Sequence, residues 1–118
     1  VGTGLPYLYS EGLVRGRLNL KRFLEASSGA AATRYGLSGR KGSIAAGMDA
    51  DLVLIDPRGT TKIEGESLLS KGRITPFEGM ILAGSIQKTY VRGRVVYDSR
   101  GGIAADPGYG KFLTWGYA

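Results

Sequence analysis

The sequence contains no histidine and no cysteine among its 118 residues. Without thiols the chain has no disulfide and no thiolate metal site. Without imidazole it cannot build the usual zinc sites, and both Ser-His-Asp and Cys-His catalysis are excluded. We therefore expect any chemistry that this chain serves to depend on groups outside it.

Long apolar runs are also missing from the sequence. No stretch approaches the roughly 20 apolar residues that a membrane helix needs, and the opening residues lack the basic and apolar regions of a signal peptide. The sequence thus indicates a soluble, cytoplasmic protein with no membrane partner. A chain of this length is enough for one domain, and because it opens on Val1 rather than Met, we expect a piece of a longer chain.

Basic residues exceed acidic ones, with a net charge of +6 and a sequence pI of about 9.8. Such a charge suits nucleic acid in principle. The Lys and Arg residues are scattered, however, and form no long basic run with interleaved aromatic residues. This pattern favours a basic solvated surface over a nucleic-acid site.

The chain divides near residue 40 into a helical part and a strand part. Short amphipathic helices are expected over residues 5–40, from apolar residues at helical spacing and from capping residues. The expected boundaries are Gly12 at the end of the first helix, Asn19 as the N-cap of the second, Ser27 or Ser28 at the start of a third and Gly36 at its end.

From residue 42 onward the pattern changes to strands. The apolar run 52–55 predicts a strand covered on both faces. The segments 89–91 and 95–97 predict a hairpin whose turn is Arg92-Gly93, with the glycine available for positive φ. A long polar connection is expected over residues 56–84, and the Gly-rich tail is expected to be irregular chain on a surface.

Three aspartates around the first strand are the obvious candidates for a metal site, because hard cations prefer carboxylate ligands. Their spacing does not fit an EF-hand loop. The interpretation we favour is that Asp49 and Asp51 bind backbone N–H groups in the turn before the strand, and that Asp56, before Pro57, ends it. No metal ligand is therefore assigned.

Two other candidates are weak. Gly2, Gly4, Gly12 and Gly16 do not have the spacing of a phosphate-binding loop, and no strand precedes them. Glu78 is a conceivable general acid or base, but it has no partner in the sequence pattern. No catalytic residue is assigned, and substrate-binding residues stay unknown.

Several stretches resemble one known family. The segment "KGSIAAGMDADLVLID" resembles the strand-turn-strand of the amidohydrolase superfamily. The stretches "LPYLYSEGLVRGRL", "TPFEGM", "YVRGRVVYD" and "PGYGKF" resemble the cyclic amidohydrolases, the group of dihydroorotase, hydantoinase, dihydropyrimidinase and allantoinase. The resemblance runs over nearly the whole chain, in the expected order.

This resemblance implies an α+β fragment of a larger enzyme. Residues 1–40 would be the closing loop and last helices of a metal-dependent (β/α)₈ barrel. Residues 41–118 would be the C-terminal part of a small β-sandwich domain, followed by the tail. Zinc or another divalent metal would be held by histidines, a carboxylated lysine and an aspartate outside this chain, so that the fragment itself holds no metal.

The implied activity is hydrolysis, or reversible closure, of a cyclic amide C–N bond, with a dihydroorotase-like reaction preferred. The parent chain would be a hydrolase of the EC 3.5.2 type, and the fragment alone would be structural rather than catalytic. The implied partners are the rest of the same enzyme, a small cyclic amide and further copies in a homo-oligomer, with no nucleic acid.

The resemblance assigns few roles to individual positions. Asp49, Asp51 and Asp56 match structural positions of the sandwich motif, and Gly93 matches its hairpin turn. The loop from Pro76 to Gly79 has no derived role, and neither have Gly2 and Thr3, which lie near the expected substrate loop. Relatives commonly have Asn-Pro where this chain has Gly29-Ala30, which leaves the helix junction open.

Two alternatives from other classes stay open. One is a small basic nucleic-acid-binding module, motivated by the net charge of +6. The other is a protein-interaction module whose unpaired strand edges recruit another chain.

Overall fold

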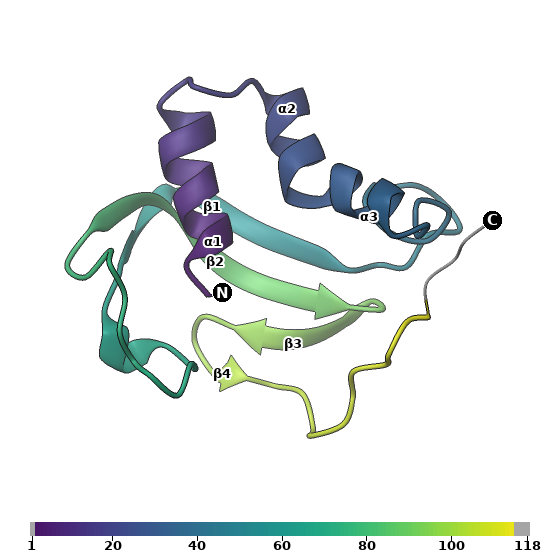
Figure 1. Ribbon diagram of the computed structural model, residues 1–118. Helices are drawn as coiled ribbons and strands as arrows, with labels where there is room; N and C mark the ends of the chain where they lie inside the picture. The colour runs from purple at the N-terminus through teal and green to yellow at the C-terminus, as the bar shows by residue number, and fades with distance from the viewer. Residues whose placement is uncertain (1, 115–118) are drawn as a thin grey trace. The chain divides into compact units, whose positions relative to one another are not determined.

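The computed structural model describes residues 2–114 (Figure 1). The helical segments are α1 (Gly4–Tyr7), the π-helical η1 (Leu8–Val14), α2 (Leu20–Leu24), the π-helical η2 (Glu25–Gly29), α3 (Ala30–Arg34) and the 3₁₀ turn η3 (Gly65–Ser67). The strands are β1 (Leu52–Lys62), β2 (Ile81–Val91), β3 (Arg94–Asp98) and β4 (Gly102–Ile103), in the sheet order β1-β2-β3-β4. Among the described helices, none is long and apolar enough to span a membrane.

Contacts divide the chain into two compact units, and each of them draws on two stretches of sequence. The first unit is Val1–Phe23 with Asp56–Ser85, and the second is Leu24–Ile55 with Ile86–Ala118. Strands β1 and β2 each contribute residues to both units. In sequence order, α3 ends at Arg34 and β1 begins at Leu52, so α-helical chain precedes the strands as expected.

The first helical stretch, α1 followed by η1, runs past Gly12, so the predicted end at that residue is wrong. Gly12 is buried, and a Cβ atom there would lie 3.0 Å from Leu18 Cδ1. The glycine therefore serves a close approach between the helix and the following turn. The helix ends instead at Val14, with Arg15 as its C-cap, before Gly16 at φ 71°.

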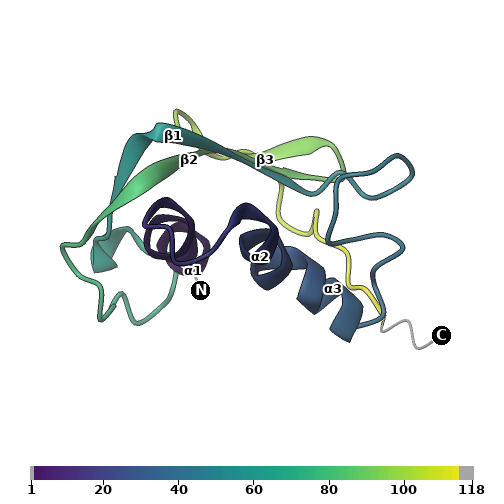
Figure 2. The ribbon, with the colours of Figure 1, turned by 90° about the horizontal axis from the view of Figure 1, so that it is seen from above.

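The second helical stretch begins as predicted at Asn19, whose Oδ1 accepts the backbone N–H of Arg22 at 2.9 Å. The predicted start of a third helix at Ser27 or Ser28 is wrong. The backbone passes from α2 through η2 into α3 along one helical path (Figure 1, Figure 2). Ser27 Oγ donates to the Leu24 carbonyl at 3.4 Å rather than capping a new helix.

The same stretch passes through Gly29-Ala30 without a break, with helical backbone angles at both residues. This settles the helix junction that the sequence left open. The predicted end is confirmed, because Gly36 has φ 65° and the N–H of Leu37 donates to the Ala32 carbonyl at 2.7 Å.

Strand β1 is longer and more exposed than predicted. It continues through Asp56 and Pro57 to Lys62, so Asp56 does not end it. Val53 and Leu54 are 42% and 52% exposed, which contradicts the expectation of cover on both faces within this chain. β1 is the first strand of the sheet order, and an edge position is where a proline is tolerated.

The predicted polar connection over residues 56–84 is correspondingly shorter. It contains the second half of β1 and the start of β2, so the connection between these strands runs only over residues 63–80. Within it, the N–H of Ile63 donates to the Met80 carbonyl at 2.8 Å and the N–H of Gly79 donates to the Ile63 carbonyl at 2.9 Å. These bonds close the loop at its base.

The β2–β3 hairpin is confirmed at the predicted turn. Val91 pairs with Arg94, and between them Arg92 and Gly93 have φ values of 49° and 78°. Two consecutive positive φ values are the signature of a type I′ turn, whose twist matches that of the strands. The short strand β4 was not predicted, and the tail beyond it is irregular as expected.

The first unit holds most of the buried apolar side chains. Phe23, Ile63 and Leu82 are 6%, 4% and 1% exposed. Tyr7 and Phe77 have ring centroids 4.7 Å apart. The contact between Tyr7 and Phe77 attaches the loop before β2 to the first helix. Packing therefore explains why these two positions are aromatic.

Candidate functional site

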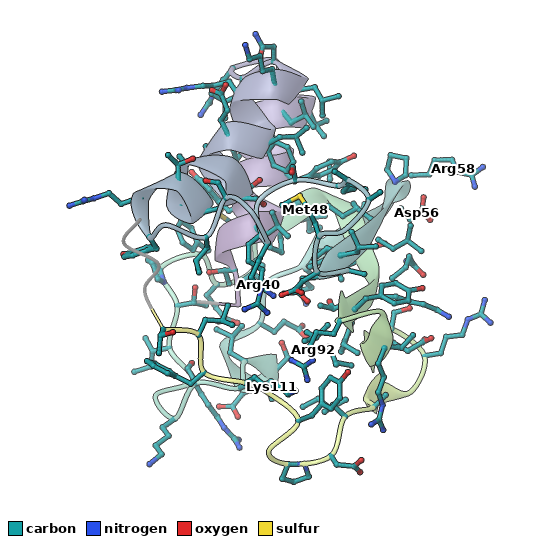
Figure 3. The ribbon with its side chains drawn as sticks, turned by 90° about the vertical axis from the view of Figure 1, so that its right-hand side faces the viewer. Arg40, Met48, Asp56, Arg58, Arg92 and Lys111 are labelled. Carbon is teal, nitrogen blue, oxygen red and sulfur yellow. The ribbon has the colours of Figure 1, made fainter. Side chains whose placement is uncertain are left out.

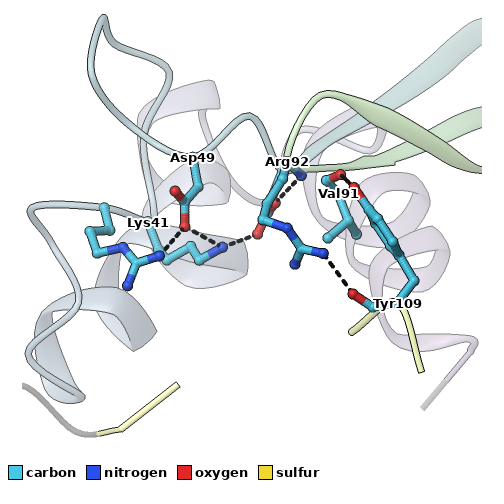
Figure 4. Close-up of polar contacts among 7 residues, drawn as sticks. Lys41, Asp49, Val91, Arg92 and Tyr109 are labelled. Carbon is cyan, nitrogen blue, oxygen red and sulfur yellow. Dashed lines mark hydrogen bonds and ion pairs between the residues drawn. The ribbon is translucent and has the colours of Figure 1, made fainter. Parts of the chain in front are cut away.

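The densest network of charged side chains in the described residues lies in the second unit, before β1. Lys41 Nζ contacts Asp49 Oδ2 at 2.9 Å and also pairs with Asp51 Oδ2. Arg40 Nη2 donates to Asp49 Oδ2 at 3.0 Å (Figure 4). We call Arg40, Lys41, Asp49 and Asp51 the Lys41 cluster.

The cluster is joined to the hairpin turn by a backbone contact. Asp51 Oδ1 accepts the N–H of Arg92 at 2.8 Å, across 41 residues of sequence. The neighbouring N–H of Gly93 donates to the Ala50 carbonyl at 2.9 Å. The turn is thus held against the segment that leads into β1.

The carboxyl groups of the cluster are biased toward their charged form. The hydrogen bond from Lys41 lowers the pKa of Asp49, with the charge of Arg40 adding to this effect. Burial by itself raises the pKa of Asp51, but hydrogen bonds from Lys41 and from the Arg92 N–H outweigh it and leave this pKa below its ordinary value.

Lys41 shows the complementary effect. Burial by itself lowers its pKa, since its side chain is only 19% exposed. The hydrogen bonds and charges of Asp51 and Asp49 outweigh that penalty, and the pKa lies above its ordinary value. A charged lysine between two charged carboxylates is a structural ion cluster rather than an acid-base pair poised near neutral pH.

Asp49 and Asp51 were predicted to bind backbone N–H groups in their own turn. This prediction is partly correct for Asp51 and wrong for Asp49. Asp51 does bind a backbone N–H, but it is that of the distant Arg92 rather than one in its own turn. Asp49 binds the side chains of Arg40 and Lys41, so its predicted backbone bond is wrong. Opposite charges on either side of a Gly-rich turn, "RKG" and "DAD", are a signal that could have indicated these pairs, and the sequence analysis missed it.

Asp56 lies apart from the cluster, inside β1. Its Oδ1 accepts the N–H of Arg58 at 2.9 Å, the local bond expected of an aspartate before proline. The Arg58 side chain is 94% exposed and points away from the ribbon (Figure 3). Among residues 2–114, Asp56 belongs to no group of three acidic side chains that could hold a metal ion.

Glu78 has a structural partner in the loop of the first unit. Its Oε2 accepts the N–H of Gly65 at 2.7 Å. A Cβ atom on Gly65 would lie 2.2 Å from the Arg73 carbonyl oxygen, so the loop requires glycine there. The bond and the contact of Phe77 with Tyr7 give the loop from Pro76 to Gly79 a packing role.

The remaining sequence candidates are backbone positions. Thr3 precedes α1, and its carbonyl accepts the N–H of Tyr7 at 3.0 Å. A Cβ atom on Gly2 would lie 3.8 Å from Leu68 Cδ2. Across residues 2–114, no three Asp, Glu, His or Cys side chains lie close enough to hold a metal ion together. The carboxylates present do not fit the metal that the resemblance implies, because Asp49 and Asp51 are already neutralised by Lys41 and Arg40.

Comparisons of sequence and of structure both point to one protein family. A sequence model described as "Amidohydrolase family" matches residues 5–96. An L-hydantoinase of Paenarthrobacter aurescens is 35% identical over 112 residues, covering 95% of this chain and 24% of the relative. A D-phenylhydantoinase of Escherichia coli is 37% identical over 113 residues, covering 96% of this chain and 24% of the relative.

Solved structures agree with the sequence relatives. The D-hydantoinase (dihydropyrimidinase) from Thermus sp. superimposes with a TM-score of 0.86 at 38% identity, over 92% of this chain and 24% of that structure. The L-hydantoinase (dihydropyrimidinase) from Arthrobacter aurescens gives a TM-score of 0.87 at 35% identity, over 95% of this chain and 25% of that structure. The chain therefore spans about a quarter of the length of the proteins it matches.

Proposed function

Because this chain belongs to the amidohydrolase family, we propose that it is the C-terminal structural part of an enzyme that hydrolyses the C–N bond of a cyclic amide. The observation that carries the proposal is the extent of the likeness. Proteins named hydantoinases match 95% and 96% of this chain, while the chain covers only 24% of their length. The reactive groups are then supplied by the other three quarters of the polypeptide.

We further propose the domain assignment that the resemblance implied. Residues 1–40 are the closing loop and helices of a (β/α)₈ barrel, and residues 41–118 are the C-terminal share of a β-sandwich with its tail. The end of α3 at Arg34 and the start of β1 at Leu52 support a boundary between them.

The exposure of β1 supports a partner that covers it. Consecutive residues of a strand point to opposite faces, and Val53 and Leu54 are 42% and 52% exposed. Each face of this strand therefore presents an apolar side chain to solvent, as expected of a surface that is normally covered. The partner we propose is the remainder of the same enzyme. The homo-oligomer and the cytoplasmic location predicted from the sequence stay proposals.

The family membership also suggests a divalent metal cofactor, zinc or a relative of it, in the whole enzyme. The acidic residues described here do not fit such an ion, so we assign its ligands to residues outside this chain. The role of the acidic residues in this chain is to stabilise the scaffold around the reacting groups. The nucleic-acid alternative is not favoured, since the relatives are hydrolases.

The substrate is best identified by testing three cyclic amides. The relatives are named for hydantoins and dihydropyrimidines, whereas the sequence alone led us to prefer dihydroorotate. The full-length polypeptide, supplied with a divalent metal, should be incubated with hydantoin, dihydrouracil and dihydroorotate, and the carboxylate formed by ring opening quantified by chromatography. Opening of at least one ring is expected. A folded, metal-loaded polypeptide that opens none of the three would overturn the proposal.

A further inference from the structure

The tail that follows β4, residues 104–114, is fastened to the hairpin at one tyrosine. We call this segment the C-terminal strap. Tyr109 Oη donates to the Val91 carbonyl at 3.1 Å, and Arg92 Nη2 donates to the Tyr109 carbonyl at 2.6 Å (Figure 4). The guanidinium carbons of Arg92 and Arg94 lie 4.4 and 5.0 Å from the centre of the tyrosine ring. The hydroxyl, the carbonyl and the ring of Tyr109 therefore all contact the hairpin.

The rest of the strap is mostly exposed. Tyr109, Ala105 and Leu113 are half-buried, and its remaining residues are exposed. At its start, the N–H of Ala104 donates to the Val96 carbonyl at 2.9 Å, which continues the pairing of β4. Further along, the Arg94–Asp106 ion pair at 3.3 Å joins side chains that are 50% and 82% exposed, so it contributes little. Tyr109 is thus the main attachment in the middle of the strap.

Arg92 is an unexpected residue for the position it occupies. A type I′ turn favours Asn, Asp or Gly at a residue with φ of 49°, because a larger side chain strains the left-handed backbone. Its N–H is held by Asp51 and the N–H of Gly93 by the Ala50 carbonyl, and neither bond uses the arginine side chain. The turn itself would therefore be better served by asparagine. The contribution that needs arginine is its planar cation over Tyr109 and its bond to the Tyr109 carbonyl.

We infer that Arg92 and Tyr109 form a clasp that fastens the C-terminal strap to the β2–β3 hairpin, and that the strained arginine serves the strap rather than the turn. The strap is then a segment that opens locally, without unfolding the hairpin, when the clasp is broken. This inference does not depend on the proposed enzymatic activity, since it uses only contacts within the second unit.

Hydrogen exchange followed by mass spectrometry on the full-length polypeptide tests the clasp. In Arg92→Asn the hydrogen-bonded amides of the strap, above all that of Tyr109, which donates to the Asp106 carbonyl at 3.2 Å, are expected to exchange about tenfold faster. The reason is the loss of a cation–π contact and a charged hydrogen bond. The amides of β2 and β3 should keep their protection, because asparagine suits the turn. Tyr109→Leu should release the strap in the same way while leaving the turn sequence intact.

Arg100→Asn is the matched control. This variant makes the same change of charge and size in the turn that follows β3. The Arg100 side chain takes no part in the contacts at Tyr109. Strap exchange should stay within about twofold of the wild type there. Unchanged strap exchange in both Arg92→Asn and Tyr109→Leu would overturn the inference. Equal release by Arg100→Asn, or loss of protection in β2 and β3 as large as in the strap, would overturn it as well.

Discussion

Replacing Gly42 by alanine tests how α3 is held against the loop that follows it. Gly42 has φ 91°, a conformation that side-chain-bearing residues rarely adopt. A Cβ atom there would lie 2.5 Å from Ala32 Cβ and 3.3 Å from Gly29 Cα. The backbone strain costs about 1–2 kcal/mol, and forcing an extra methyl into a packed contact costs about 1–3 kcal/mol. The free energy of unfolding should therefore fall by about 2–5 kcal/mol.

Gly47 in the same loop provides the matched control. Its φ of 86° is nearly the same, but an added Cβ atom would meet nothing within 4 Å. Gly47→Ala should therefore cost only the backbone strain, about 1–2 kcal/mol. The gap between the two variants isolates the contact with Ala32.

The steric part can be reversed by removing the atom that Gly42→Ala strikes. Ala32→Gly deletes that Cβ at a cost of about 1 kcal/mol for glycine inside a helix. The double variant should be more stable than the sum of the two single changes by about 1–3 kcal/mol. Denaturant titration of the full-length polypeptide gives the free energies, and hydrogen exchange of the α3 amides localises the effect. Equal losses for Gly42→Ala and Gly47→Ala, or no coupling with Ala32→Gly, would show that a steric contact with Ala32 does not limit the residue at position 42.

Three further predictions concern the polar contacts. Lys41→Met should lower the free energy of unfolding by about 1 kcal/mol, because it leaves two carboxylates without their shared cation. This loss should be smaller in 1 M NaCl, where charges are screened over about 3 Å. A loss that does not depend on salt would argue against the ion cluster. The carboxyl pKa values in the Lys41 cluster are lowered and that of Lys41 is raised. The difference in the free energy of unfolding between wild type and Lys41→Met should therefore be constant from about pH 5 to about pH 10. It should vanish as pH falls through the lowered carboxyl pKa values, and again as pH rises through the raised pKa of Lys41. Measuring the denaturation midpoint as a function of pH checks this. Ser10→Ala should cost about 1–3 kcal/mol, because the buried Ser10 Oγ accepts the N–H of Ala83 at 3.0 Å, whereas the exposed Ser27→Ala should cost less than about 0.5 kcal/mol in the same titration.

Local chemistry made part of the fold predictable from the sequence. The Arg92-Gly93 turn, the Asn19 cap and the helix end at Gly36 each follow from the backbone needs of a few adjacent residues. The errors at Gly12 and Ser27 have the opposite origin. Both residue types usually favour helix ends, but here Gly12 makes room for Leu18 and Ser27 bonds back to its own helix.

The second half of β1 shows tertiary contacts overriding propensity. Its "DPRGT" stretch contains residue types that are depleted in strands. It is nevertheless held by β2: Thr61 Oγ1 donates to the Gly84 carbonyl at 2.8 Å, and a Cβ atom on Gly59 would lie 2.0 Å from Ser85 Oγ. A close approach of this kind explains the glycine, but only once the strand pairing is known.

The roles of the acidic residues were largely missed from the sequence, since several of their partners lie far away along the chain. Asp56 bonds only two residues ahead, although it does not end the strand as predicted. Asp51 reaches Arg92 across 41 residues, and Glu78 reaches Gly65 across 13, which no local pattern reveals. Tyr109, the aromatic end of the clasp, likewise contacts Arg92 and Val91 across 17 and 18 residues.

We propose that this chain supplies scaffold to the enzyme and none of its reacting groups. This proposal is tested most directly by measuring kcat for ring opening in full-length Asp49→Asn, Asp51→Asn, Asp56→Asn and Glu78→Gln variants whose folding has been verified. Each variant should retain kcat within about threefold of the wild type, since a lost general acid or base costs about a hundredfold or more. A hundredfold fall in kcat in any one folded variant would contradict the account.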